Sequence, residues 1–143
     1  MVRAATLLLL LAATPAFAQT TPVGLWRTVD DHTGQATGVV RIFEQSGHLY
    51  GNIQQVFDPA KARAQCGYCK DDRHNQPVLG LQIIRGLKAD GATWDGGQIL
   101  DPETGDTYRC SMRLAQGGQS LVVRGFLGIS LFGRSQTWTR VPG

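Results

Sequence analysis

Three cysteines are the side chains of this sequence best suited to covalent or metal chemistry. Cys66 and Cys69 form a C-x-x-C pattern, and Cys110 follows about 40 residues later. Because three is an odd number, at most one disulfide can form within the chain, and one thiol then stays free. A bridge from the C-x-x-C to Cys110 would close a loop of about 40 residues and contribute roughly 3–4 kcal/mol, whereas a Cys66–Cys69 bridge would contribute less. The sequence therefore predicts a structural disulfide, with both pairings open.

The same cysteines allow two other kinds of chemistry. Thiol–disulfide exchange favours a C-x-x-C at a helix N-terminus, where the helix dipole lowers the thiol pKa. Here the short predicted helix precedes the motif, so its C-terminal end faces the cysteines. The second possibility is a metal centre, in which a Cys3His set suited to zinc would consist of Cys66, Cys69, His74 and Cys110. No second C-x-x-C or H-x-x-H supports that set, so we expect no cofactor and keep zinc as a minor alternative.

The other polar residues match no catalytic pattern. The chain has no G-x-S-x-G, no phosphate-binding loop and no dinucleotide fingerprint. Its three histidines are scattered over predicted turns, and its paired aspartates, Asp30-Asp31 and Asp71-Asp72, are typical of turns. We therefore expect a protein that is not an enzyme.

The first 18 residues have the pattern of a secretory signal peptide. Arg3 gives a positive start, residues 4–13 form an apolar run too short to span a bilayer, and Ala16-Phe17-Ala18 is an A-x-A cleavage site. We expect a single exported domain over residues 19–143, most simply in a bacterial periplasm. An oxidising compartment of this kind favours the disulfide.

Charge is distributed unevenly along the chain. The whole sequence has 14 basic and 11 acidic residues, too small an excess for a nucleic-acid-binding protein. From residue 107 to the C-terminus, however, there is no Asp or Glu, while this stretch contains Arg109, Arg113, Arg124, Arg134 and Arg140. These arginines are either a solvated strand face or a basic surface that meets anionic lipid or an acidic ligand.

Short β-rich segments separated by glycine-containing turns predict an all-β fold. Residues 107–114 alternate most clearly, with Tyr108, Cys110, Met112 and Leu114 on one face. Eight candidate strands follow this pattern, at 25–30, 39–45, 48–57, 81–88, 93–100, 107–114, 120–127 and 136–141. They predict an eight-stranded antiparallel barrel with hairpin connections, and a two-sheet sandwich is the alternative. Candidate ligand-binding residues of the barrel interior are Tyr108, Met112, Leu121 and Val123.

Two connections are unusual. The segment 58–80 is long for a loop, and Asp58-Pro59 predicts a helix start within it, with the helix ending near Cys66-Gly67. We expect this segment to cap one mouth of the barrel or to lie along its side. The segment 126–133 is more apolar than an exposed loop, which predicts either core closure or a lid or partner contact.

Several sequence blocks resemble a bacterial exported family known as domain of unknown function 2147. They are GLWRTVDDHTG, VVRIFEQSGHLYGNI, CGYCKDD, PVLGLQIIRGL, WDGGQILDPETGDTYRCSMRL and LVVRGFLGISLFGRSQTWTRV. The resemblance implies a lipocalin-like barrel and no particular activity. Gly24-Leu25-Trp26 also resembles the G-x-W of lipocalins, which implies that Trp26 closes one barrel end beneath a basic residue, either Arg140 or Arg134.

These observations favour an exported, non-enzymatic barrel that binds a small apolar or amphipathic ligand. A protein that interacts with or maintains the cell envelope through its basic outer surface is the alternative, and a cysteine-based metal or redox site is the third. The predicted partners are accordingly a small hydrophobic ligand or an anionic lipid surface, without nucleic acid and without a transmembrane span.

Overall fold

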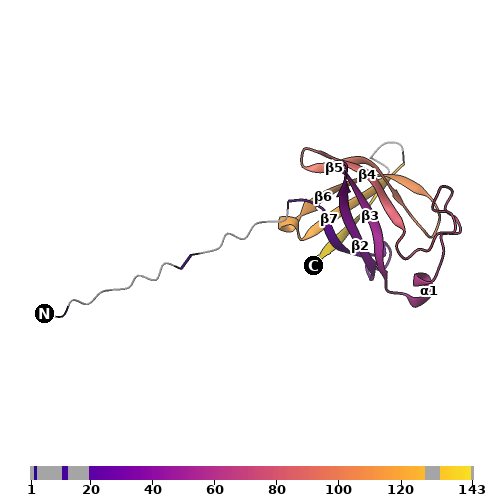
Figure 1. The fold of residues 1–143 in the computed structure, drawn as a ribbon, viewed down its shortest axis with the longest axis horizontal. Helices are drawn as coiled ribbons and strands as arrows, with labels where there is room; N and C mark the ends of the chain where they lie inside the picture. The colour runs from indigo at the N-terminus through magenta and orange to yellow at the C-terminus, as the bar shows by residue number, and fades with distance from the viewer. Residues whose placement is uncertain (1, 3–10, 13–19, 128–132, 143) are drawn as a thin grey trace.

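The computed structural model describes residues 2, 11–12, 20–127 and 133–142. Eight antiparallel strands pair in chain order and close into a barrel (Figure 1). The strands are β1 (Gly24–Val29), β2 (Ala36–Gln45), β3 (His48–Val56), β4 (Gln82–Asp90), β5 (Thr93–Leu100), β6 (Thr107–Ala115), β7 (Ser120–Phe126) and β8 (Gly133–Val141). The barrel predicted from the alternating pattern is confirmed, and the sandwich alternative is wrong. Most of the predicted leader and the middle of the apolar 126–133 segment lie outside the described residues.

Closure comes from pairing between the first and last strands. Trp26 lies opposite Arg140, with Leu25 and Arg27 opposite Val141 and Thr139. The β2–β3 hairpin turns at Ser46-Gly47, where both residues have positive φ, as a two-residue turn between twisted strands requires. β2 and β8 each begin three residues before the expected position, because backbone pairing continues past the last apolar side chain.

The barrel interior is filled by one connected hydrophobic core. Every strand contributes side chains to it, from Trp26 on β1 to Trp138 on β8. Gly51 and Gly97 lie on the inward face, where an added Cβ would come within about 3 Å of core atoms of Ile84 and Leu87 respectively. The small residues therefore make room for large neighbours.

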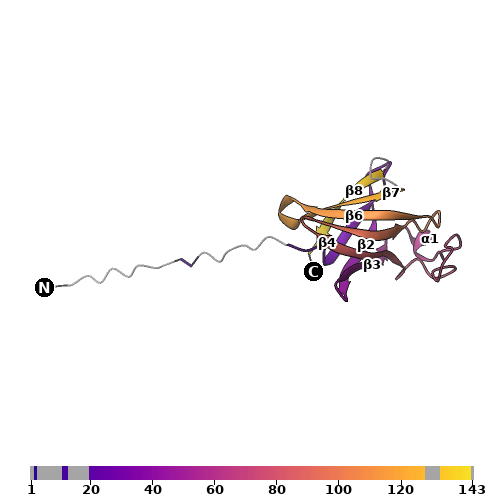
Figure 2. The same cartoon turned by 90° about the horizontal axis from the view of Figure 1, so that it is seen from above.

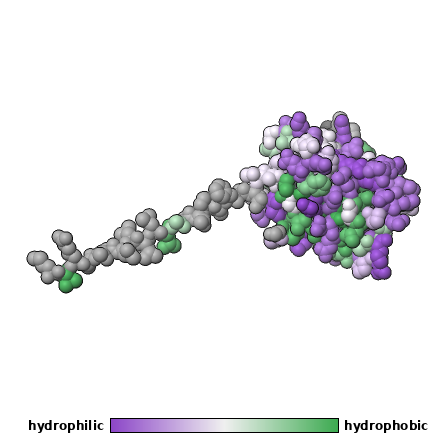
Figure 3. Space-filling model, viewed as in Figure 1, coloured by the Kyte–Doolittle hydropathy of each residue, from purple (hydrophilic) through white to green (hydrophobic). Residues whose placement is uncertain are grey.

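The two ends of the barrel differ (Figures 1 and 2). One end, here the tryptophan end, has the short turns 46–47 and 91–92 and the 3-10 helix η1 (Gln116–Gly118). The other, here the loop end, has the β1–β2 turn 30–35, the long segment 57–81 and the β5–β6 turn 101–106. On the face seen in Figure 3, hydrophilic residues cover much of the barrel and hydrophobic residues lie between them in smaller patches.

The long segment begins with a short helix, α1 (Pro59–Ala62), at the loop end. The Asp58 side chain caps it by accepting a hydrogen bond from the Ala60 amide at 2.9 Å, with Pro59 in the first turn. The predicted helix start is thus confirmed, but its predicted end near Gly67 is wrong. The chain instead turns back at Cys66, whose amide donates to the Gln76 carbonyl at 2.8 Å. Within the described residues, no helix is long and apolar enough to cross a membrane.

Candidate ligand site

The cysteine pair is closed locally. Cys66 and Cys69 form a disulfide, and Cys110 is a free, buried thiol. The long segment is therefore not bridged to Cys110 on β6. The estimate of roughly 3–4 kcal/mol for that bridge does not apply, and the smaller estimate for the local bridge does. The two sites are in different places. Cys110 belongs to the inward face of β6. The long segment turns on itself beside the β5–β6 turn, where Cys66 Sγ lies 3.7 Å from the Pro102 carbonyl oxygen. Desolvation raises the pKa of the Cys110 thiol to about 12.

The four residues of the zinc alternative do not converge. The His74 ring Nδ1 lies 2.8 Å from the Cys69 carbonyl oxygen rather than from a sulfur. Among the residues that the structure describes, no three His, Cys, Asp or Glu side chains are grouped as metal ligands. Both disulfide cysteines are almost fully buried, so a thiolate in solution has no path to either sulfur. The geometry of the cysteines is that of a structural cross-link.

Two arginine–aspartate pairs hold the long segment against β4. Arg73 is 4% exposed, pairs with the Asp71 carboxylate through Nη2 at 2.6 Å and donates from Nη1 to the Gln82 carbonyl at 2.9 Å. The hydrogen bonds from Arg73 hold the pKa of Asp71 well below its usual range. Arg85 makes a two-pronged contact with Asp72, both N···O distances being 2.9 Å, and these hydrogen bonds lower the pKa of that carboxyl. The paired aspartates act as anchors of the segment.

The four predicted interior residues fall into two groups. Met112, Leu121 and Val123 are at most 4% exposed and belong to the packed core. Their surroundings are side chains of the core, so they offer no free lining for a ligand. Tyr108 is half-buried, near the loop end of the same inward face. Of the four, Tyr108 is the residue positioned to meet a ligand.

Inward positions of β6, β7 and β8 change in character toward the loop end. The row nearest the tryptophan end is large and apolar, with Leu114, Leu121 and Trp138 paired across the strands. In the row nearest the loop end, Gly125 stands between Cys110 and Arg134. An added Cβ at Gly125 would lie 3.5 Å from Ile99 and from Tyr108, which is ordinary contact. The missing side chain leaves the inward surface of β7 bare beside Tyr108, with room for a Cβ atom.

A polar chain of contacts lies along β8 on the same side. Buried Trp138 donates its indole N–H to the Gln136 side-chain oxygen at 2.8 Å. The Gln136 amide nitrogen donates to Asp31 Oδ1, and Arg134 Nη1 lies 3.5 Å from Asp31 Oδ2. Polar groups thus extend from the core to the rim beside Gly125. An apolar surface with a few convergent polar groups is typical of small-molecule sites.

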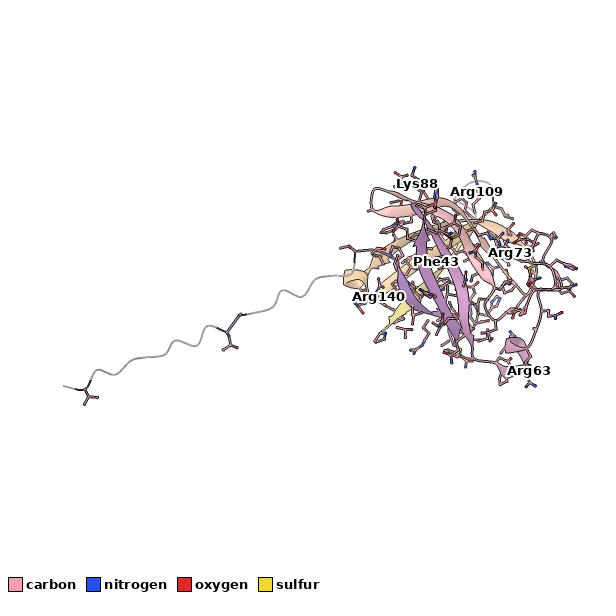
Figure 4. All side chains as sticks on the ribbon, viewed as in Figure 1. Phe43, Arg63, Arg73, Lys88, Arg109 and Arg140 are labelled. Atoms are coloured by element: carbon pink, nitrogen blue, oxygen red, sulfur yellow. A yellow bond between two sulfur atoms is a disulfide. The ribbon has the colours of Figure 1, made fainter. Side chains whose placement is uncertain are left out.

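The opposite end is closed by Trp26 and Arg140. The Arg140 guanidinium carbon is 4.3 Å from the Trp26 ring centroid, a cation–π arrangement. Arg140 also donates to the carbonyls of Gly118, Val23 and Thr21 at 2.8–2.9 Å. Figure 4 shows Arg140 at one end of the barrel and Arg63 and Arg73 at the other. The sequence offered Arg140 and Arg134 for this position, and the structure places Arg140 there. Arg134 lies at the loop end, beside Asp31.

Sequence reasoning missed Gln136, the pairing role of Asp31 and the burial of Arg73. Asp31 and Gln136 are 105 residues apart, so no local pattern could join them. The alternation of β8 does contain a signal, because Arg134, Gln136 and Trp138 are alternate residues and therefore share the inward face of the strand.

The closed eight-stranded barrel, with a tryptophan and arginine at one end and longer connections at the other, defines a lipocalin-like protein. A solved structure, described as protein HP1028 from the human pathogen Helicobacter pylori and as belonging to the lipocalin family, is similar to it with a TM-score of 0.74. The two share 19% sequence identity over 87% of this chain and 85% of that one, so the likeness shows the fold alone.

Residues 24–140 match the family model described as an uncharacterized protein conserved in bacteria, DUF2147. The chain belongs to this family, and the resemblance of its sequence blocks is confirmed. No curated protein has a matching sequence.

Proposed function

We propose that this protein is an exported, non-enzymatic barrel that binds a small amphipathic ligand at its loop end. The observation that carries the proposal is the bare inward surface at Gly125, which has Tyr108 and Ile99 on one side and the Asp31–Gln136–Arg134 contacts on the other. The lipocalin-like fold supports it, because barrels of this size hold one small ligand at most.

The packed core limits how deep the ligand reaches. Met112, Leu121, Val123 and Trp138 fill the barrel interior next to Gly125. The apolar part of a ligand would therefore lie across Gly125 against the Tyr108 ring, and its polar group would meet Gln136 or Arg134 at the rim. Arg134 is the cationic member of this set and its side chain is largely exposed, so an amphiphile with an anionic head can compete with the Asp31 carboxylate for it.

A direct test uses dodecanoate as the amphiphile and the quenching of tryptophan fluorescence as the signal, because Trp138 is bonded to Gln136. Truncating Tyr108 to Ala removes apolar contact worth about 1–2 kcal/mol, so the expected loss of affinity is roughly 5- to 30-fold. Gly125→Leu places a side chain against Tyr108 and Ile99 and should weaken binding at least as much.

The matched control is Tyr50→Ala. Tyr50 is half-buried like Tyr108, but it stacks on Phe43 on β2 and β3, on the outward-facing side of the barrel wall. It should change dodecanoate affinity less than about twofold. Circular dichroism of each variant shows that the barrel is folded. Saturable binding that Tyr108→Ala and Gly125→Leu leave unchanged would refute the site, and so would no saturable binding at all.

The leader pattern of residues 1–18 supports export as part of the same proposal. Osmotic-shock release from the producing bacterium, followed by intact mass, tests it. The expected product begins at Gln19, and a cytoplasmic product that retains Met1 would contradict export.

A further inference from the structure

The outer wall of the barrel has a groove that the proposed ligand site does not use. The groove has a volume of about 280 Å³ and lies mainly across β6, β7 and β8. Its lining is mixed: polar and basic groups come from Thr93, Ser111, Arg113, Arg124 and Ser135, and apolar surface comes from Val122 and an edge of Met112. No acidic residue is among them.

Strand register explains why the cations gather there. Ser111, Arg124 and Ser135 are directly opposite one another on the three strands. Arg113 is opposite Val122, which makes it a diagonal neighbour of Arg124, about 7–8 Å away between Cα atoms. Two guanidinium groups therefore reach the same groove from adjacent strands.

The side chain of Arg124 is positioned by β8. Its Nη1 donates to the Ser135 hydroxyl at 3.4 Å, and an added Cβ at Gly133 would come within 3.0 Å of its Cζ. Because Gly133 has no side chain, the guanidinium can lie against the β8 backbone at this point. On the neighbouring strand, Asp95 is opposite Lys88 of β4 in the strand register.

We propose that this groove is a binding site for a phosphate ester. Arginine forms paired N–H···O bonds that fit the geometry of a phosphate, and a guanidinium is always charged. The hydroxyls of Ser111, Ser135 and Thr93 supply further donors around the same space. The groove is at the lower limit of volume for ligand pockets, so it fits a phosphate with part of its alcohol rather than a whole lipid. The ester is therefore either a soluble molecule or the headgroup of an anionic lipid.

The test compares two double variants that remove the same charge. Arg113→Gln with Arg124→Gln empties the groove of its cations. Arg27→Gln with Arg41→Gln removes two exposed arginines that are also diagonal neighbours, on β1 and β2. Each protein is titrated with glycerol 3-phosphate while the backbone amide signals of Ser111 and Ser135, which every variant keeps, are followed by NMR. Each is also sedimented with phosphatidylcholine vesicles with and without phosphatidylglycerol, at low and high salt.

The site predicts saturable shifts of the Ser111 and Ser135 amide signals with glycerol 3-phosphate, salt-sensitive sedimentation with phosphatidylglycerol vesicles, or both. The first result identifies a soluble ester, the second a lipid headgroup. The groove variant should weaken the observed binding at least about tenfold and the control variant less than about twofold. Equal losses in the two variants would show a response to net charge alone and overturn the site. Absence of binding in both arms would also overturn it.

Discussion

The disulfide gives a prediction whose size depends on which cysteines are joined. Cys66 and Cys69 are three positions apart, so their bridge closes a loop of only a few residues. On the chain-entropy model such a short loop contributes about 2 kcal/mol, whereas a bridge from Cys66 to Cys110 would contribute about 4 kcal/mol. For a domain of this size, 2 kcal/mol corresponds to a change of roughly 6–10 °C in Tm.

The measurement is equilibrium urea unfolding of the oxidised wild-type protein and of protein that was reduced while unfolded and then refolded with reductant. Reduction keeps both sulfur atoms in place, so the difference in unfolding free energy isolates the covalent link. We expect a loss of about 2 kcal/mol and a reduced protein that is still folded. Cys110→Ala is the matched control, because its response to reductant should be the same as that of the wild type.

Thiol alkylation gives an independent readout of the same pairing. The native oxidised protein should take up no label, because Cys110 is 1% exposed and burial raises the pKa of its thiol to about 12. Denaturation should expose one thiol, and denaturation with reduction should expose all three. If Cys110→Ala abolished the effect of reductant, Cys110 would be one of the bridged residues and the local pairing would be refuted.

Three further perturbations test the ends and the core of the barrel, each by urea unfolding. Arg140→Gln removes the contact with Trp26 and the charged donors to three carbonyls, so it should lower the free energy of unfolding by about 2–4 kcal/mol. Arg140→Lys should lower it less, because lysine keeps the cation. Equal losses in the two variants would contradict a role for the charge over the ring. Asp71→Asn should destabilise the protein near pH 7 by about 1–3 kcal/mol, because it leaves buried Arg73 without its carboxylate. Since folding lowers the pKa of Asp71 from 3.8, this difference should be constant above about pH 5 and shrink as the pH falls below 4; a constant difference down to pH 2 would contradict the pairing. Leu121→Ala should cost about 2–5 kcal/mol, because Leu121 is fully buried among core side chains, and a loss below 1 kcal/mol would show a loosely filled interior.

The strands of this protein are visible in the sequence because one face of each is buried. The alternation of Tyr108, Cys110 and Met112 with polar residues predicted which face of β6 points inward, and burial in the structure follows it. The turn Ser46-Gly47 and the cap at Asp58-Pro59 are also local features, set by the few residues that form them.

Contacts between distant segments could not be predicted in this way. The choice between Cys69 and Cys110 as partner of Cys66 depends on where a long segment lies relative to β6, which no periodicity encodes. The same holds for Arg73, a charged residue in a loop that becomes buried because Asp71 and the Gln82 carbonyl are close enough to satisfy it. An interior lined by apolar residues and one filled by them also have the same sequence pattern, so the packing of Met112 and Leu121 had to come from the structure.

The two proposed sites lie on opposite surfaces of one strand, which makes them separable. Gly125 is on the inward face of β7, opposite Cys110, and its neighbour Arg124 is on the outward face, opposite Ser111. Gly125→Leu should therefore weaken dodecanoate binding and leave the phosphate ester unaffected, and the Arg113–Arg124 double variant should do the reverse. Joint loss of both activities in either variant would mean that the wall itself had been disturbed. Independent loss would show that this small barrel, with its centre filled by its own side chains, binds through the two surfaces of its β6–β8 wall.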